Sequence, residues 1–508
     1  MRAPSFPPVD RTALSSGVAV LLLSAVAGQG AWAQDLRIAH VTLISPELAG
    51  AMRDVTVSVH EGRIAAIAPG RAGDGSAAGS DAVAFDAHGL YLAPGLIDSH
   101  VHLEAIPGMT AEQERQHPEL ARAAREQIPR SFLQFGYTTL VDLNSAPQAM
   151  APWRSHALVP DTYFCGGAVL MDGYPMNYLP KPERYRMMPY MLIEPGSAAP
   201  DGVDAAAHTP EAVVARMKAD GAICVKTFFE RGFGSAHDLP VPQLATIRAL
   251  VHTAHAAGLP VLMHANSSEA QRFALDAGVD IIAHGLWNWD EALPANALTP
   301  RVRNVLDRVI ETHTGWQPTI QVLFGLRDLT HSAFLGDPML RRVLPENLIT
   351  WYTSSEGQWF RDQLASDFRT SDPEKLQKQA DRVFGTLITR DERATAYLAA
   401  HKARLLFGTD TPSAPTYANP PGLNGFREMH NLKAAGLSPA QIFRMATIVN
   451  ARALHLDAEV GTVQVGKRAN LLLLREDPTR SIEAYADIDR IILGGRLIDP
   501  AELYPPAN

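Results

Sequence analysis

The chain is expected to fold as an α/β protein: a (β/α)8 TIM barrel of parallel strands with a small β-sandwich domain built from both terminal segments. Two observations predict this architecture. Short apolar runs alternate with helical stretches through the middle of the chain, which is the pattern of parallel β/α units. Strand-like runs separated by turn residues flank this region at both ends. The length of 508 residues leaves room for both parts.

The first 33 residues have the pattern of an export signal. Arg2 and Arg11 precede the apolar run 13–27, and Ala-Trp-Ala at 31–33 then supplies a cleavage site with small residues at both ends. The run is shorter than the roughly 20 residues that span a membrane. We therefore expect a signal peptide over 1–33, cleavage after Ala33 and a periplasmic or secreted protein, with a retained single-pass anchor as the alternative.

The segments next to the two termini are expected to form strands. These runs are 36–44, 54–59 and 63–67, and later 461–465, 469–474 and 490–493. Alternation of apolar and polar residues is clear in the second run. The simplest arrangement joins 34–93 and 456–508 in one composite small β domain and leaves 94–455 for the barrel.

Eight short apolar runs in the central region are the expected barrel strands. They are 96–102, 138–143, 162–170, 223–229, 260–265, 280–286, 318–323 and 405–409. Two connections between them, 171–209 and 327–404, are long. Long loops on a barrel usually shape the substrate pocket, so we expect these two to do so.

Composition excludes several classes of partner. The net charge is −9 and no basic stripe is present, so nucleic acid is not an expected partner. After signal cleavage no membrane association is expected, because no other segment is apolar enough to span a bilayer. Cys165 and Cys224 are too few for a disulfide scaffold. We expect two buried free thiols, and a bridge only if their strands are neighbours in an oxidising compartment.

Chemistry-bearing side chains gather at the ends of the expected strands. His100 and His102 are separated by one residue, so on a strand they share a face and can reach one metal ion. Polar residues also end four later runs: Lys226, His264, His284 and Asp410. In a barrel these strand ends meet at one rim, where active sites lie.

Each of these residues has a simpler explanation when it is taken alone. His264 or His284 could be a hydrogen-bonded core histidine, and Asp410 could cap the segment that follows it. Lys226 could be a strand-end charge that reaches solvent. Their recurrence at successive strand ends is hard to explain as packing and favours one shared site.

The motifs resemble those of the amidohydrolase superfamily, in particular its prolidase-like and imidazolonepropionase-related branch. The matching segments are 93–102, 225–226, 263–265, 283–285, 407–410, 446–454 and 461–474. The resemblance extends from about Leu36 to Leu497 and implies a barrel with a metal centre at its rim. One departure is the stretch Thr-Phe-Phe-Glu-Arg-Gly-Phe-Gly after Lys226, where many relatives carry a small, glycine-rich loop.

The resemblance implies two divalent metal ions, with Zn²⁺ expected. It assigns the more buried ion to His100, His102 and Asp410. It assigns the second ion to His264 and His284. These side chains offer the nitrogen and oxygen ligands that zinc accepts.

The resemblance also implies that Lys226 bridges both ions as an N-carboxylated (carbamylated) lysine. A free ammonium group has no lone pair, and carboxylation converts it into an anionic oxygen ligand. Without this modification the site would hold one ion. The ligands would then be His100, His102, His264 and Asp410.

The implied activity is hydrolysis of an amide or peptide-like C–N bond by metal-activated hydroxide. The expected partner is a small-molecule substrate such as a dipeptide or an N-acyl amino acid. Asp410 would take the proton of the attacking water and hand it to the leaving amine. Tyr137, Tyr178 and Arg231 lie in or near expected rim loops and are candidate substrate contacts, although a surface or packing role is the simpler explanation for each. Relatives often assemble, so a homo-oligomer is compatible with the resemblance.

Other activities remain open at this point. A cyclic amidase or deaminase would use one metal ion and an unmodified Lys226. A phosphoester or lactone hydrolase would use the same site. A binding protein without catalysis is a further alternative, although every expected ligand is present.

Overall fold

The structure, a computed structural model, describes most of the chain between Asp35 and Pro506. The described residues are 35–70, 83–179, 184, 188–233, 238–289, 297–413 and 415–506. The expected export signal, 1–33, lies outside them. No helix within the described residues is long and apolar enough to cross a membrane.

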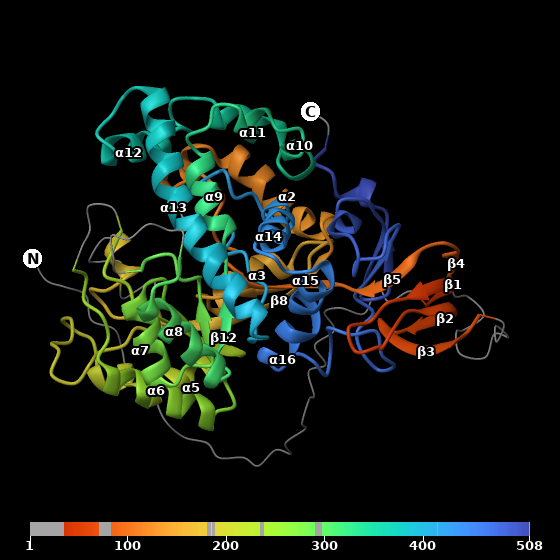
Figure 1. The fold of residues 1–508 in the computed structure, drawn as a ribbon, viewed down its shortest axis with the longest axis horizontal. Coiled ribbons are helices and arrows are strands. Elements are labelled where there is room, and N and C mark those ends of the chain that lie inside the picture. The colour runs from red at the N-terminus through yellow and green to blue at the C-terminus, as the bar shows by residue number, and fades with distance from the viewer. Residues whose placement is uncertain are drawn as a thin grey trace, which may run out of the picture. The chain divides into compact units, whose positions relative to one another are not determined.

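A seven-stranded parallel sheet carries the central β/α units (Figure 1). Its order is β6-β7-β8-β9-β10-β11-β12, so each strand lies beside the one before it in the chain. The strands are β6 (Leu96–Val101), β7 (Tyr137–Asp142), β8 (Asp161–Ala168), β9 (Cys224–Phe228), β10 (Val261–His264), β11 (Ile281–Ala283) and β12 (Gly315–Gln317). Almost all of their residues are buried, as expected for a parallel sheet that is covered on both faces.

The last two expected strands differ from the structure. The run 318–323 is wrong as a strand: β12 ends at Gln317, and helix α9 (Gln321–Asp328) begins soon after it. An apolar run this short does not distinguish a strand from a buried helix. The run 405–409 is irregular, yet it bonds to both edges of the sheet. Leu406 N donates to Trp316 O at 2.9 Å, and Phe407 O accepts from Ser99 N of β6 at 3.3 Å.

Helices follow most of the strands, and several begin at a side-chain cap followed by proline. Thr209, Thr299 and Asp372 each accept a hydrogen bond from the first turn of the helix that they precede. The helices are α1 (Ala111–Gln116), α2 (Pro118–Gln134), α3 (Pro147–Arg154), α5 (Pro210–Ala219), α6 (Leu244–Ala256), α7 (Ser268–Ala277), α8 (Pro300–Glu311), α9, α10 (Leu340–Val343), α11 (Glu346–Tyr352), α12 (Trp359–Asp367), α13 (Pro373–Ala400), α14 (Leu423–Ala434), α15 (Pro439–Arg444) and α16 (Asn450–Ala453). The long connection 327–404 is therefore largely helical, and α13 runs beside α9 (Figure 1).

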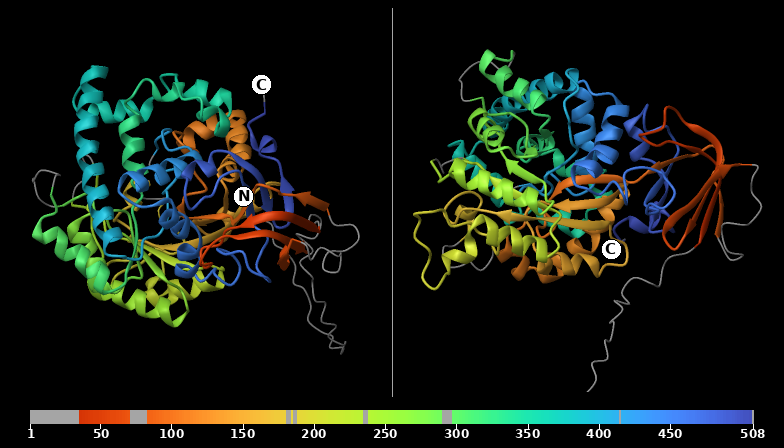
Figure 2. Two further views of the ribbon diagram at one scale, coloured as in Figure 1. Left: turned by 45° about the vertical axis from the view of Figure 1, so that its right-hand side comes forward. Right: turned by 90° about the horizontal axis from the view of Figure 1, so that it is seen from below.

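The two terminal segments meet in one eight-stranded sheet (Figures 1 and 2). Its strands are β1 (Leu36–Leu43), β2 (Met52–His60), β3 (Arg63–Pro69), β4 (Val83–Asp86), β5 (Tyr91–Pro94), β13 (Leu471–Leu474), β14 (Ile488–Leu493) and β15 (Arg496–Ile498). The join is an antiparallel pair in which Leu92 of β5 lies opposite Leu473 of β13. The two-layered sandwich and the domain boundaries remain predictions.

The expectation of two free thiols is wrong, because Cys165 and Cys224 form a disulfide. The two cysteines lie directly opposite each other on the neighbouring parallel strands β8 and β9. Their Cα atoms are 4.4 Å apart, which is within the range of a disulfide. The sequence could not show this pairing, since it depends on the register between strands that are 59 residues apart.

Asn450 holds β6 against the irregular segment 405–409. Its Nδ2 donates to Ile97 O at 2.9 Å and to Phe407 O at 2.7 Å, and its Oδ1 accepts from Phe407 N at 3.0 Å. Asn450 is completely buried, so water does not compete for these hydrogen bonds. One amide side chain therefore stands in for part of the hydrogen bonding that a regular eighth strand would make.

Replacing Asn450 with alanine should lower the free energy of unfolding by about 2–4 kcal/mol, because it leaves a buried N–H without its acceptor. Urea denaturation followed by circular dichroism measures this change. Asn304→Ala is the matched control, since Asn304 is exposed on α8. Equal stability of the two variants would contradict the role given to Asn450.

Removing the disulfide should lower the free energy of unfolding by about 2–4 kcal/mol, because the unfolded chain loses a cross-link over a long loop. The comparison is between wild type and Cys165→Ala/Cys224→Ala in urea, with and without reductant. Reductant should destabilise the wild type and leave the variant unchanged. Free thiols detected by alkylation of the unreduced wild type would contradict the bridge.

Candidate metal centre

The six strand-end residues come together at the carboxyl ends of the parallel strands. His100 is the last residue but one of β6 and His102 follows that strand, Lys226 lies in β9, His264 ends β10, His284 follows β11 and Asp410 follows the segment 405–409. All six line one pocket of about 290 Å³. Residues up to 310 positions apart in the sequence therefore lie in one pocket. This convergence at the carboxyl ends of parallel strands is what the barrel topology predicts.

Asp410 lies between the two histidines of the first motif. Its Oδ1 is 2.9 Å from His102 Nε2 and 2.9 Å from His100 Nε2. The first contact is a hydrogen bond, whereas His100 Nε2 is buried and makes no hydrogen bond within the described residues. Two lone-pair atoms this close repel each other unless a proton or a cation lies between them. A metal ion fits this arrangement.

Neighbouring side chains orient two of the imidazole rings. His100 Nδ1 lies 3.2 Å from Gln317 Oε1, and Gln317 Nε2 donates to Ser99 Oγ at 2.8 Å. An amide oxygen only accepts, so Nδ1 of His100 carries the proton and Nε2 keeps its lone pair for the pocket. His284 Nδ1 is held by Thr319 Oγ1 at 3.0 Å, which leaves the other nitrogen of that ring free.

The ligand atoms of His100, His284 and Asp410 lie within 4.8 Å of one another. Burial and the charge on Lys226 lower the pKa of His100 to about 3. Burial and the nearby His264 lower the pKa of His284 well below its ordinary value. Both rings are therefore neutral at pH 7, which is the form that binds a cation.

Lys226 is buried in the same pocket, and it forms no ion pair with the residues that the structure describes. Its Nζ has no hydrogen-bond partner among the described residues and lies 5.4 Å from the centre of the Phe228 ring. Burial lowers the pKa of Lys226 to about 7, although the charge on Asp410 opposes that shift. A large fraction of the amine is then unprotonated at neutral pH, which N-carboxylation by CO2 requires. The donor set as a whole fits divalent metal ions.

Glu230 is a residue of this site that the sequence did not indicate. It follows β9 and is buried, and its Oε2 lies 3.1 Å from His264 Nε2. The same oxygen accepts from Asn266 Nδ2 at 2.8 Å, and Oε1 accepts from Gly232 N at 2.9 Å. A carboxylate accepts only, so it places the proton of His264 on Nε2 and leaves Nδ1 to bind a cation. The only sequence feature that pointed to Glu230 was the stretch after Lys226, which departs from the glycine-rich loop of many relatives.

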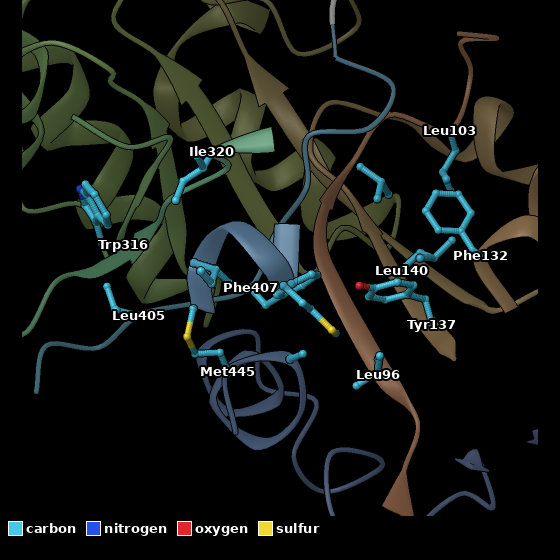
Figure 3. Close-up of a cluster of buried hydrophobic side chains, with 14 of the residues drawn as sticks. Leu96, Leu103, Phe132, Tyr137, Leu140, Trp316, Ile320, Leu405, Phe407 and Met445 are labelled. Atoms are coloured by element: carbon cyan, nitrogen blue, oxygen red, sulfur yellow. The ribbon is translucent and has the colours of Figure 1, made fainter. Parts of the chain in front are cut away.

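Of the three candidate substrate contacts, only Tyr178 lines the pocket. Tyr137 is fully buried and stacks on Phe407, with ring centres 5.7 Å apart (Figure 3). Arg231 is half-exposed and forms an ion pair with Glu269 at 2.8 Å. Packing therefore accounts for Tyr137 and a surface ion pair for Arg231, and neither residue lines the pocket.

Solved structures of several hydrolases share this fold. A Xaa-Pro dipeptidase with bound methionine gives a TM-score of 0.60 at 19% identity and covers 92% of this chain and 100% of its own. The A. niger ochratoxinase gives 0.60 at 19% identity, with 92% and 96% covered. Phenylurea hydrolase B gives 0.61 at 20% identity, with 92% and 97% covered. At these identities the similarity shows the fold alone.

Comparison of the sequence with known proteins finds two short matches to deaminases and a match to one protein family. The 5-methylthioadenosine/S-adenosylhomocysteine deaminases of Thermoanaerobacter pseudethanolicus and Caldanaerobacter subterraneus are each 31% identical over 112 residues, which is 18% of this chain and 25% of each relative. The chain thus spans about a quarter of the length of these curated relatives. The profile of the Amidohydrolase family matches residues 91–288 and 357–498, most of the chain. The chain therefore belongs to the amidohydrolase family of metal-dependent hydrolases.

Proposed function

We propose that this chain hydrolyses an amide or peptide-like C–N bond in a small substrate such as a dipeptide or an N-acyl amino acid. The observation that carries the proposal is the cluster of four imidazoles, the Asp410 carboxylate and Lys226 in one pocket, where His100 Nε2 and Lys226 Nζ are buried without a hydrogen-bond partner among the described residues. Such a cluster is costly to bury unless cations complete it. The shared fold with a Xaa-Pro dipeptidase supports the choice of bond.

The proposed centre holds two divalent ions, Zn²⁺ in our proposal. The ligands would be His100, His102, His264, His284, Asp410 and carboxylated Lys226. When bound, such ions lower the pKa of water and polarise a carbonyl oxygen.

The protein's own part in the reaction is proton transfer by Asp410. Its carboxylate accepts a proton from the attacking water and delivers it to the leaving nitrogen. The water oxygen bonds to the carbonyl carbon and the C–N bond breaks. The products are a carboxylic acid and an amine, and no oxidant or reductant is consumed.

A second candidate function is a cyclic amidase or deaminase that uses a single metal ion. The group formed by His100, His284 and Asp410 favours it, because three ligand atoms within 4.8 Å suit one ion. The short match to two deaminases points the same way. Metal content separates the two candidates, since the first requires two ions and a modified Lys226.

We also propose that the protein is exported after cleavage of residues 1–33 and acts in the periplasm or outside the cell. The Cys165–Cys224 disulfide supports this location, because such bridges persist in oxidising compartments and are rare in the cytosol. The basic residues, short apolar run and small-residue site of the N-terminus support it from the sequence.

His100→Ala, His264→Ala and Asp410→Asn should each lower kcat/KM for dipeptides and N-acyl amino acids by at least about a thousandfold, because each removes a ligand or the proton carrier. His88→Ala, an exposed histidine, is the control and should keep wild-type turnover. Elemental analysis should give about two metal ions per wild-type chain. Wild-type turnover in any ligand variant would refute the proposed site.

Glu230→Gln should weaken zinc binding about 10–100-fold, because an amide no longer fixes the tautomer of His264. Competition with a chelator measures the affinity, and ¹⁵N chemical shifts of the metal-free protein report which ring nitrogen carries the proton. Glu269→Gln is the matched control, since Glu269 pairs with Arg231 at the surface. Unchanged affinity and an unchanged tautomer in Glu230→Gln would show that Glu230 does not orient the ring.

A further inference from the structure

The pocket has an aromatic side that plays no part in the proton transfer described above. Tyr174 is its centre: its ring centre lies 5.8 Å from that of Phe228 and 6.0 Å from that of Tyr178. Phe233 does not line the pocket itself but packs against Tyr174, with ring centres 5.6 Å apart. Leu179 and Met188 extend this surface along the pocket. We call these six residues the aromatic wall.

The aromatic wall begins at the ligand cluster itself. The ring of Tyr174 lies 4.8 Å from that of His264, and Phe228 lies 6.1 Å from the same imidazole. Behind the wall lie the buried side chains of Val169, Met176 and Met191. Apolar packing from behind keeps such a surface in place.

Two members of the aromatic wall are unusually open to solvent. Tyr178 is 63% exposed and Phe233 is 41% exposed. Large apolar side chains that stay exposed beside a concave site commonly cover an apolar part of the ligand. The lining of the pocket also includes polar side chains, among them His102, Asp410, Asn144 and Ser413.

We propose that the aromatic wall is a subsite for an aromatic or large aliphatic group attached directly beside the scissile C–N bond. This inference rests on the proposed function and names its substrate class. The ring centres of Tyr174 and His264 are 4.8 Å apart. The aromatic wall therefore lies next to the position of the reacting bond and not beside a remote part of the substrate. A charged group there would lose its water without gaining a counter-ion. Among the described lining residues, Lys226 and Asp410 are charged, and both belong to the proposed metal centre.

Matched N-acetyl amino acids test this subsite in the zinc-loaded protein. N-acetyl-phenylalanine should be hydrolysed with a kcat/KM at least about tenfold above those of N-acetyl-alanine and N-acetyl-glutamate. The double variant Tyr178→Ala/Phe233→Ala should lose this preference through a higher KM for N-acetyl-phenylalanine. Both side chains are exposed, so the fold should persist. Tyr504→Ala, also 41% exposed, is the control and should keep the preference.

A binding measurement separates failure of the subsite from failure of the proposed function. Calorimetry compares N-acetyl-phenylalaninamide with N-acetyl-alaninamide as ligands. Tighter binding of the first, lost in the double variant, supports the subsite even if no amide is hydrolysed, in which case only the proposed function falls. Equal hydrolysis of the phenylalanine and alanine substrates, or a preference that survives the double substitution, overturns the subsite and leaves the proposed function standing.

Discussion

The site depends on the hydrogen bonding between β6 and the segment that leads to Asp410. The Asp98 carboxylate accepts from Thr409 N at 3.1 Å and from Thr409 Oγ1 at 2.6 Å, and it also accepts from His100 N at 3.2 Å. Asp410 N in turn donates to His100 O at 2.7 Å. These bonds bring the first histidine motif and Asp410 to the same point although they are far apart in the chain. Without them the pocket has neither its proton carrier nor a complete set of ligands.

The polar interior of the pocket has a cost that the protein alone does not offset. His100 Nε2 and Lys226 Nζ are both buried without hydrogen bonds within the described residues. Burial of an unpaired polar group is unfavourable, and more so for a charged one. Bound cations and a carboxylated lysine would satisfy both atoms, so these two buried groups favour metal binding. Glu230 adds to this preparation because it orients His264 before any ion arrives.

The sequence predicted which residues converge but not how they are held. Strand periodicity and apolar runs placed His100, His264 and His284 at strand ends, because local patterns fix local structure. The disulfide, Glu230 and the Asn450 contacts depend on register and on loop paths, which no local pattern encodes. The run 318–323 failed for a related reason: a few apolar residues suit either a strand or a helix. Tyr137 begins β7, at the end of the strand opposite the pocket, and it is buried in the core.

The most direct test of the two-metal account is a crystal structure of the zinc-loaded protein with anomalous scattering measured at the zinc absorption edge. The account predicts two anomalous peaks roughly 3.5–4 Å apart between His100, His264 and Asp410, with continuous density for a carboxylate on Lys226 Nζ. A single peak beside an unmodified lysine would contradict it and favour the one-metal alternative.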